Sequence, residues 1–445
     1  MSAYRKYAKL PGFRDFPPEE LAFRNHIFDA WRRVAGRYGY REYDGPPLEE
    51  LELYTDKSGS EIVGQLYEFT DKGARRVALR PEMTPSLARI LAGRSRALRK
   101  PIRWFSIPQL FRYERQQRGR LREHFQWNVD LVGEPGTGAD AEVLAVAIDG
   151  LRELGLGAAD IRARVSDRIL LSGVFAALEV PPGLTPGVFA ALDRIEREPV
   201  ERIHERLAGP GGLGLGRERA DAVLEFFSDP TIGRIERDFA GSPRVAERGA
   251  ELRQYESVLG DLGFADFVEF DFSIVRGLAY YTGIVFEIFD RAGRFRAICG
   301  GGRYDRLMEH VGGDRLSAVG FGMGDVVLGE VVRGRGLLPE YRPGVDYYII
   351  SISVAEAPLA RRIAGVQRRL GRSVVYTLGG KSVKKQFSSA AALGAGSVIV
   401  LGPDEVERGV AVVREMASGQ EREIPIAELT DPARGKSPSE TLRAS

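Results

Sequence analysis

Apolar residues recur at helical spacing close to the start of the chain. The stretch "PPEELAFRNHIFDAWRRVAGRYGY" begins with prolines and acids and ends its periodic pattern at Gly39, which is typical of an amphipathic helix with an acidic first turn. The next stretch, "REYDGPPLEELELY", predicts a short strand that stops at Pro46 and Pro47. We therefore expect a long helix that leads into a strand.

Three later segments alternate between apolar and polar residues and predict strands. They are "RRVALRPEM", "IRWFSIPQLFRYE" and "HFQWNVDLVG", and because no crossover helix joins them, an antiparallel sheet is expected. From about residue 170 to residue 258 the pattern is helical, around a flexible "GPGGLGLG". Strands return in "DFVEFDFSIVRGLAYYTGIVFEIFD", so the sheet is predicted to be completed from both sides of a helical insertion.

Strands and helices alternate in the C-terminal part of the chain. After a linker at 334–344, residues 345–432 predict a separate α/β domain with a mostly parallel sheet. Residues 433–445 are polar and are expected to be disordered. The expected fold class is α+β, with an antiparallel sheet flanked by helices in 1–333, the helical insertion, and the C-terminal α/β domain.

Composition changes this picture little. The 445 residues exceed one typical core, and 43% hydrophobic with 28% charged residues is usual for a globular protein. The formal net charge is only +2, from 64 basic and 62 acidic residues. Any attraction to nucleic acid must therefore come from local clusters of charge.

Cysteine and histidine are scarce, which narrows the chemistry. The single Cys299 excludes an internal disulfide framework, and four histidines with one cysteine argue against a structural zinc site, so no metal-ligating residue is singled out from the sequence. The N-terminal "MSAYRKYAKLPGFRDF" has no apolar signal core, and no run approaches the length of a membrane span. We expect a cytoplasmic protein without a membrane partner.

The stretch "FRYERQQRGRLREHFQWNVD" concentrates arginines around a predicted hairpin loop. Guanidinium groups bind phosphates and carboxylates through two parallel hydrogen bonds, which suggests a polyanionic ligand. An arginine-rich loop taken alone is more often a solvated, charged hairpin.

Polar residues in two other segments, and in the strand at the end of this stretch, favour the ligand-binding interpretation. Together they offer carboxylates for an ammonium group, an arginine for a carboxylate or phosphate, and tyrosine hydroxyls for a small polar ring. An amino acid beside a nucleotide fits this set, which comprises Glu82, Thr84, Gln126, Asp130, Arg276, Tyr280 and Tyr281. Each also has a structural explanation: a helix N-terminal acid, an exposed strand face, or strand packing for the tyrosines.

The glycine-rich "AICGGGRYDRL" is weaker evidence. Its three glycines allow a close approach of backbone to a ligand, but they also suit an ordinary turn. The spacing matches neither a dinucleotide-binding nor a Walker loop.

Nearly the whole chain, from "LPGFRDFPPEE" to "REIPIAEL", resembles the histidyl-tRNA synthetases, which are class II aminoacyl-tRNA synthetases. "GPPLE" resembles their dimer-forming motif, and "FRYERQQRGRLREHFQ" resembles their ATP-binding hairpin. "LRPEMTPS" matches too, while "RGLAYYTG" and "GGGRYD" resemble the two histidine-specific motifs. "GKSVKKQFSSAAALGAGSVIVLGPDEVERGV" resembles the anticodon-binding domain. The resemblance implies a class II catalytic domain in 1–333 and an anticodon-binding domain in 345–432.

The resemblance also implies the reaction and the ligands. L-histidine would attack the α-phosphorus of ATP to give histidyl-adenylate and pyrophosphate, and histidine would then pass to the 3′ end of histidine tRNA. The implied cofactor is Mg²⁺, and the implied assembly is a homodimer. Two anions must meet in this reaction, so the protein would act by positioning and by neutralising charge.

Family roles can be carried over residue by residue. The histidine site would comprise Glu82 and Thr84 beside the ammonium group, Gln126 and Arg276 near the carboxylate, and Asp130, Tyr280 and Tyr281 around the imidazole with Tyr304 close by; Met83 and Arg112 would also belong to this site. The ATP site would comprise Arg112 at the α-phosphate with Glu114, Arg120 and His124. Arg112 and Arg276 would be the catalytic pair.

The sequence departs from the family pattern at a few positions. Val327 stands where the last class II motif usually carries an arginine against adenine, and His124 stands where phenylalanine is usual. "ERQQ" replaces the common "ERPQ", and Ala279 replaces an aspartate. These differences concern adenine contacts and the acceptor stem more than the histidine site.

Two other functions remain open from the sequence. One is the catalytically silent regulatory subunit of ATP phosphoribosyltransferase, which shares the catalytic fold, senses histidine and normally lacks an anticodon-binding domain. The other is an RNA-binding or stress-sensing module derived from a synthetase, which only the departure at Val327 supports.

Overall fold

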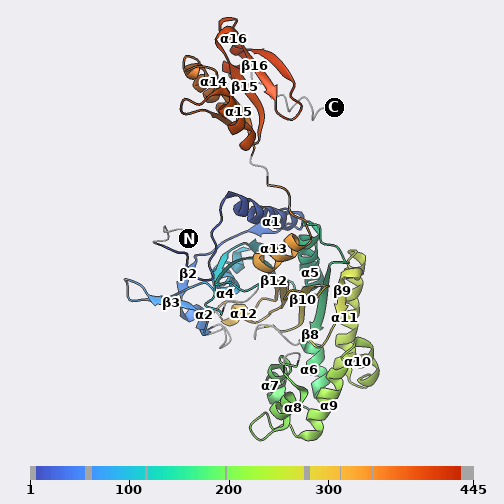
Figure 1. Cartoon of the computed structure of the whole chain (residues 1–445). Coiled ribbons are helices and arrows are strands. Elements are labelled where there is room, and N and C mark those ends of the chain that lie inside the picture. The colour runs from blue at the N-terminus through green and yellow to red at the C-terminus, as the bar shows by residue number, and fades with distance from the viewer. Residues whose placement is uncertain are drawn as a thin grey trace. The chain divides into compact units, whose positions relative to one another are not determined.

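The structure is a computed structural model of the chain. It describes residues 7–55, 63–115, 119–195, 198–274, 281–310, 312–341 and 344–431. The chain divides into two compact units, Met1–Pro339 and Glu340–Ser445 (Figure 1). Each unit has its own hydrophobic core.

A nine-stranded sheet forms the centre of the first unit. Its inner strands pair antiparallel, and only the outer pairs β1/β5 and β8/β9 are parallel. The predicted antiparallel sheet is confirmed, and it is built from chain on both sides of the insertion. In spatial order the strands are β1 (Arg41–Glu42), β5 (Ile102–Ser106), β7 (Glu123–Val132), β12 (Ala318–Gly324), β11 (Cys299–Arg303), β10 (Ile284–Asp290), β8 (Ile161–Asp167) and β9 (Val268–Phe270), with β6 (Gln109–Phe111) on β7.

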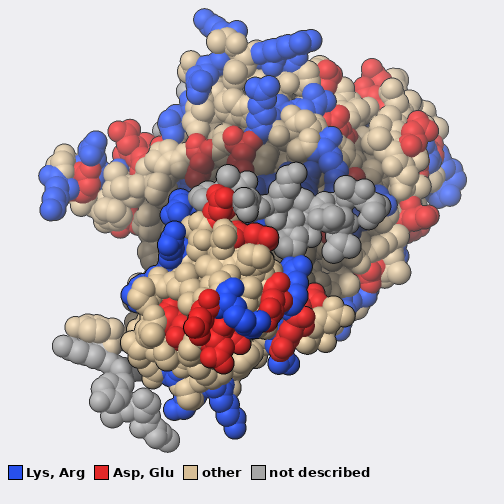
Figure 2. Space-filling view, turned by 90° about the horizontal axis from the view of Figure 1, so that it is seen from above, with Lys and Arg blue, Asp and Glu red and all other residues tan. Residues whose placement is uncertain are grey.

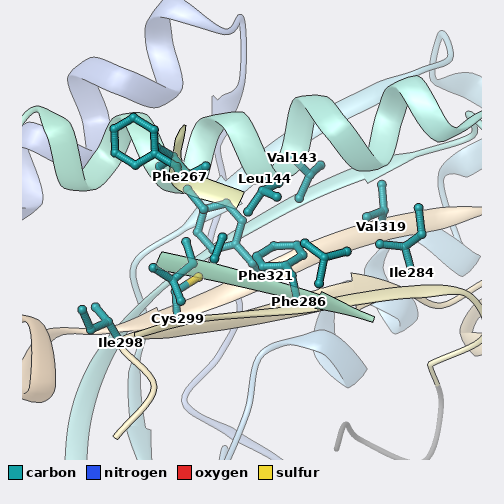
Figure 3. Packing of buried hydrophobic residues seen from close by; sticks show 14 of the residues in the cluster. Val143, Leu144, Phe267, Ile284, Phe286, Ile298, Cys299, Val319 and Phe321 are labelled. Atoms are coloured by element: carbon teal, nitrogen blue, oxygen red, sulfur yellow. The ribbon is translucent and has the colours of Figure 1, made fainter. Parts of the chain in front are cut away.

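Helices α1 (Pro18–Arg37) and α5 (Thr137–Arg152) pack together against this sheet. Figure 3 shows Val143 and Leu144 of α5 above Phe321 of β12 and Phe286 of β10. Helix α1 has the predicted acidic first turn. At Gly150 of α5 an added Cβ would lie 2.4 Å from the Trp127 ring, so only glycine allows this close approach of helix to sheet.

The glycine-rich segment, for which the sequence suggested a turn or a close approach to a ligand, is the strand β11 in the middle of the sheet. Glycine is disfavoured in strands, but both neighbours, β10 and β12, pair with this one along its length. An added Cβ at Gly301 would lie 2.6 Å from the Gly320 carbonyl oxygen. Close packing between neighbours therefore requires glycine here.

The helical insertion begins at the end of β8. The Asp167 side chain accepts a hydrogen bond from the backbone N–H of Leu170 and so caps the first helix. The last helix, α11, returns to pack against α5 and α6. The helices are α6 (Arg168–Ala177), α7 (Thr185–Leu192), α8 (Val200–Ala208), α9 (Arg217–Ser228), α10 (Ile232–Asp238) and α11 (Pro243–Asp261), with the 3-10 turns η2 (Pro182–Leu184) and η3 (Ala265–Phe267).

Shorter elements complete the first unit. A three-stranded sheet has the order β2-β4-β3, and β4 leads into α4 beside the cavity described below. These elements are β2 (Leu48–Glu50), α2 (Glu52–Thr55), β3 (Tyr67–Thr70), β4 (Arg76–Leu79), α4 (Thr84–Ala92), η1 (Ser95–Ala97), α12 (Leu307–His310) and α13 (Asp325–Gly334).

The second unit is a five-stranded sheet of order β14-β13-β15-β16-β17. The first three strands are parallel, whereas β16 and β17 form an antiparallel hairpin, because the short turn between them leaves no room for a crossover helix. Its elements are β13 (Val345–Ser351), α14 (Ala357–Arg369), β14 (Val374–Tyr376), α15 (Val383–Ala392), β15 (Ala395–Leu401), α16 (Pro403–Glu407), β16 (Val410–Glu415), β17 (Glu421–Pro425) and α17 (Ile426–Thr430).

Charged side chains are intermixed on the surface. On the face seen in Figure 2, basic and acidic residues lie among one another, in keeping with the small net charge. Among the helices of the described residues, none combines the length and the apolar character that a membrane crossing needs.

Candidate active site

A cavity of about 410 Å³ opens on the sheet of the first unit. This volume lies within the range of about 300 to 1,000 Å³ typical of small-molecule sites. Eight residues singled out from the sequence line it, although they come from four separate segments. They are Glu82, Thr84, Arg112, His124, Gln126, Asp130, Tyr281 and Tyr304.

The alternation of β7 decides which of its side chains face the cavity. His124, Gln126, Asn128 and Asp130 line the cavity, whereas Trp127 and its apolar neighbours are buried in the core. A shift of one residue in register would exchange the two faces. Asn128 was not singled out from the sequence, although the same period-two pattern indicates it.

Two glycines of β12 make room for the polar side chains of β7. An added Cβ at Gly320 would lie 2.3 Å from Oδ1 of Asp130, and one at Gly322 would lie 2.7 Å from the Gln126 side-chain amide. Both distances are shorter than any non-bonded contact, so larger residues here would displace the cavity wall. The alternating glycines in "GFGMG" are the sequence signal for this part of the cavity wall, which we call the cavity floor.

Asp130 and Tyr304 form a hydrogen-bonded pair at the cavity. The Tyr304 hydroxyl donates to Oδ1 of Asp130, and both residues are buried. Burial raises the pKa of Asp130 to about 7, although the bond from Tyr304 opposes this shift. Near neutral pH this carboxyl group can therefore either donate or accept a proton or hydrogen bond.

The cavity wall beside α4 carries another carboxylate, Glu82. Glu82 is buried, and Thr84 begins α4. Arg112 is held against this loop, because its Nε donates to the Pro81 carbonyl oxygen at 2.9 Å. Met83 was expected in the histidine site, but its side chain is fully buried and is not part of the cavity wall.

The arginine-rich hairpin is confirmed as the connection between β6 and β7. Within it, Nε of Arg120 lies 3.0 Å from Oε2 of Glu114, and the Arg122 guanidinium lies 4.0 Å from the Tyr113 ring centre. Glu114 and Arg120, expected in the ATP site, pair with each other and lie outside the cavity wall. Within its described residues, the hairpin thus combines an internal ion pair and a cation–π contact with an arginine, Arg112, at the cavity.

His124 and Val327 occupy different surroundings. Burial, together with Arg112 and Arg14, lowers the pKa of His124 to about 3, so its ring is neutral at working pH. Val327 packs against the core, and its Cγ2 lies 3.2 Å from the position of a Cβ on Gly119 in the hairpin. The residue at the last-motif position therefore contacts the hairpin and is not part of the cavity wall.

An ion-pair network supports the strand that carries His124. Nε of Arg14 lies 2.6 Å from Glu123 and Nη1 lies 2.9 Å from Asp325. Asp325 also accepts a hydrogen bond from the Phe125 backbone N–H at 2.9 Å. This network could not be predicted from the sequence, because no local pattern links residues so far apart.

Some expected residues cannot be compared with the structure. Arg276, Ala279 and Tyr280 lie outside the described residues. Conversely, the cavity wall includes Glu287 and Cys299, which were not assigned to the site. Within the described ranges, no three His, Cys, Asp or Glu side chains converge as a metal-binding group.

Sequence comparison identifies two families along the chain. Residues 12–324 match the family Histidyl-tRNA synthetase, and residues 346–434 match the family Anticodon binding domain. A protein of Opitutus terrae named Histidine–tRNA ligase is 42% identical over 423 residues, covering 94% of this chain and 96% of that protein. A chloroplastic/mitochondrial Histidine–tRNA ligase of Arabidopsis thaliana is 40% identical, covering 94% of this chain and 85% of that protein.

Solved structures share the fold. A histidyl-tRNA synthetase from a Nostoc species has a TM-score of 0.76 at 22% identity, covering 96% of this chain and 99% of that chain. An ATP phosphoribosyltransferase regulatory subunit/histidyl-tRNA synthetase from Bacillus halodurans has a TM-score of 0.72 at 22% identity, covering 89% and 98%. The expected fold class is confirmed. With its first family match spanning most of its length, the chain belongs to the histidyl-tRNA synthetase family.

Proposed function

We propose that the cavity is where this chain activates L-histidine with ATP, as a histidine–tRNA ligase. The reaction gives histidyl-adenylate and pyrophosphate, and histidine then passes to the 3′ end of histidine tRNA. The main support is that three features meet at one cavity: the buried carboxylate of Glu82, the guanidinium of Arg112, and the hydrogen-bonded pair Asp130–Tyr304. The family match and the relatives named Histidine–tRNA ligase support the same reaction.

The amino acid would lie between α4 and β7. Glu82 and Thr84 would bind its ammonium group, Gln126 its carboxylate, and the Asp130–Tyr304 pair its imidazole. A carboxyl group whose pKa is about 7 matches a ring of similar pKa, because one proton can be shared between the two. Tyr280 and Tyr281 would complete the ring site, and Met83 would support it from the core.

ATP would lie toward the hairpin. Arg112 would bind the α-phosphate, with Arg276 on the opposite side, and the neutral His124 ring would stack on adenine. Glu114 and Arg120 would contact the rest of ATP after giving up the ion pair that they form with each other. The protein supplies no nucleophile, because the histidine carboxylate attacks the phosphorus itself.

Mg²⁺ is expected to enter with ATP. Such ions usually keep one or two protein carboxylates and bind mainly to phosphate oxygens and water, so a converged protein cage is unnecessary. Glu114 at the base of the hairpin would supply a carboxylate, and the ion would neutralise phosphate charge.

The other proposals concern the domains and the assembly. Residues 1–333 would be the catalytic domain with its insertion at about 170–258, 334–344 the linker, 345–432 the anticodon-binding domain and 433–445 a tail. The protein would work in the cytoplasm as a homodimer, with the "GPPLE" segment, which runs into β2, at the interface. Light scattering should then give twice the mass of one chain.

The regulatory alternative has less support. A neighbour whose name includes that role shares the fold at 22% identity, which carries no function. The second unit matches an anticodon-binding family, which a histidine sensor does not need.

Charging of tRNA tests the proposed function. The full chain is incubated with ATP, Mg²⁺, labelled histidine and histidine tRNA, and label in the tRNA is counted. We expect charging that depends on both ATP and this tRNA. A folded protein that binds histidine and ATP without charging any tRNA would reject the proposal.

A further inference from the structure

Four buried charged side chains form a cluster behind the cavity, and none of them is part of its wall. Arg303, at the end of β11, holds Asp140 of α5 through two contacts, Nε–Oδ1 at 3.0 Å and Nη2–Oδ2 at 2.6 Å. Arg248 of α11 holds Asp167 in the same way, at 3.0 and 2.7 Å. Two bidentate salt bridges, Arg303–Asp140 and Arg248–Asp167, therefore lie close together in the first unit.

Gly283 lies between the two arginines. An added Cβ at this position would lie 3.3 Å from Cδ of Arg303 and 3.6 Å from Nη2 of Arg248. The Gly283 carbonyl also accepts a hydrogen bond at 3.1 Å from the backbone N–H of Arg168, the first residue of the insertion. The entry to β10 is thus clamped between both arginine side chains.

The clamped segment is tied to the cavity through its neighbours. The Thr282 backbone N–H donates to the Arg303 carbonyl at 2.7 Å, and the Thr282 hydroxyl donates to Asp305 at 3.0 Å. Tyr281 and Tyr304, which line the cavity, are the immediate neighbours of these residues. The segments of the two tyrosines are therefore hydrogen-bonded to each other directly beside Gly283.

Residues at both ends of the helical insertion belong to the cluster. Asp167 caps α6 by accepting from the Leu170 backbone N–H at 2.6 Å, and Arg248 comes from the last helix, α11. Although burial opposes its charge, hydrogen bonds to Asp167 and then to Glu251 raise the pKa of Arg248, so it stays a cation. An alternative partner for Asp167 would have to replace a bidentate contact.

We propose that Arg248 is a positioning residue for histidine: by holding Asp167 and flanking Gly283, it fixes the segment of Tyr281 against the segment of Tyr304. The packing of the helical insertion thereby sets the shape of the histidine pocket. This inference rests on the proposed function, since it assigns the two tyrosines to histidine. It leaves the ATP half of the cavity independent of Arg248.

The test compares substitutions of Arg248 and of its partner Asp167 in the full chain. Arg248→Gln removes the charge, Arg248→Lys keeps it without the two-pronged contact, and Asp167→Asn keeps the shape of the cap. Arg253→Gln is the matched control, because Arg253 lies on the same helix in exposed ion pairs with Glu236 and Glu256. Histidine affinity is measured by calorimetry, and both KM values by pyrophosphate exchange at a temperature where circular dichroism shows folded protein.

The expected result is a selective loss of histidine binding. For Arg248→Gln and Asp167→Asn we expect the Kd and KM for histidine to rise by roughly 10- to 100-fold, the cost of a slightly misplaced contact. For Arg248→Lys, the Kd and KM for histidine should lie between those of these variants and those of the wild type. In all three variants the KM for ATP should stay within about twofold of the wild-type value. A purely structural role would lower the active fraction and leave KM unchanged.

An unchanged histidine Kd in the folded variants overturns the proposal, as does an equal rise for Arg253→Gln. If Arg248→Gln does not fold, Arg248→Lys and Asp167→Asn decide the question by the same Kd. Failure of the proposed function looks different: the wild type would bind histidine but give no exchange. A wild type that does not bind histidine would overturn both.

Discussion

At the scale of single residues, burial and hydrogen bonding determine what each cavity group can do. Asp130 is buried and bonded to Tyr304, and its pKa is about 7. His124 is neutral because its pKa is about 3. The types and positions of these residues could be predicted from the sequence, but their ionisation could not. It depends on neighbours such as Arg14, which is far away in the chain and carries no local pattern.

Asp130→Asn should change how stability depends on pH. The folded pKa of about 7 lies above the ordinary aspartate value of 3.8, so the folded state binds more protons between these pH values. Wild-type stability should therefore fall as pH rises from about 4 to 7, by up to about 4 kcal/mol relative to Asp130→Asn. Urea unfolding across this range checks it. Parallel curves for both proteins would show that Asp130 titrates normally.

His124→Ala should weaken ATP binding and spare histidine binding. An aromatic ring stacked on a base contributes about 1 to 3 kcal/mol, so the KM for ATP should rise at least about fivefold. His204→Ala is the matched control, because His204 pairs with Asp221 in the insertion and does not line the cavity. If the KM for ATP does not change, adenine binds elsewhere.

At the scale of elements, hydrophobic period was a good guide where one face is buried. It predicted the helix α1 and the strand β7, with its cavity face and its core face. It could not predict β11, because three glycines have no period and a strand of glycines depends on its neighbours. The alternation of strands and helices also led to a mostly parallel sheet for the C-terminal domain, although the short turn between β16 and β17 makes these two strands an antiparallel hairpin.

Gly320→Ala tests how the strands shape the cavity. The new methyl group would lie within 2.3 Å of Oδ1 of Asp130, so this side chain must move. We expect the KM for histidine to rise by about tenfold or more, with folding retained. Gly36→Ala in α1, where an added Cβ meets nothing within 4 Å, is the control. An equal KM for histidine in the two variants would mean that histidine binding does not depend on the position of the Asp130 side chain.

At the scale of the whole molecule, the chain combines two units with separate cores. The discontinuous sheet was predictable, because strand patterns stand on both sides of a helical stretch. The buried cluster of Arg248 and Arg303 was not, since it brings together charged residues from elements that meet only after folding. Long-range polar contacts of this kind leave no repeat in the sequence.

Removing the residues after Gly344 should separate the two functions. The exposed Lys384 and Lys385 at the start of α15 are expected to bind tRNA phosphates. The truncated protein should therefore need roughly 10²-fold more tRNA for charging, while pyrophosphate exchange remains. The full chain with Lys384→Glu and Lys385→Glu should show part of the same loss. Unchanged, salt-insensitive tRNA binding would contradict this role.

Histidine-dependent ATP–pyrophosphate exchange tests the central claim most directly. The wild-type chain should exchange pyrophosphate with histidine and with no other amino acid, and Arg276→Ala should lower the rate by roughly 10² to 10³ while circular dichroism stays unchanged. Exchange in Arg276→Ala within threefold of wild type would reject that residue's role. A wild type that binds histidine but gives no exchange at millimolar ATP would contradict the account as a whole.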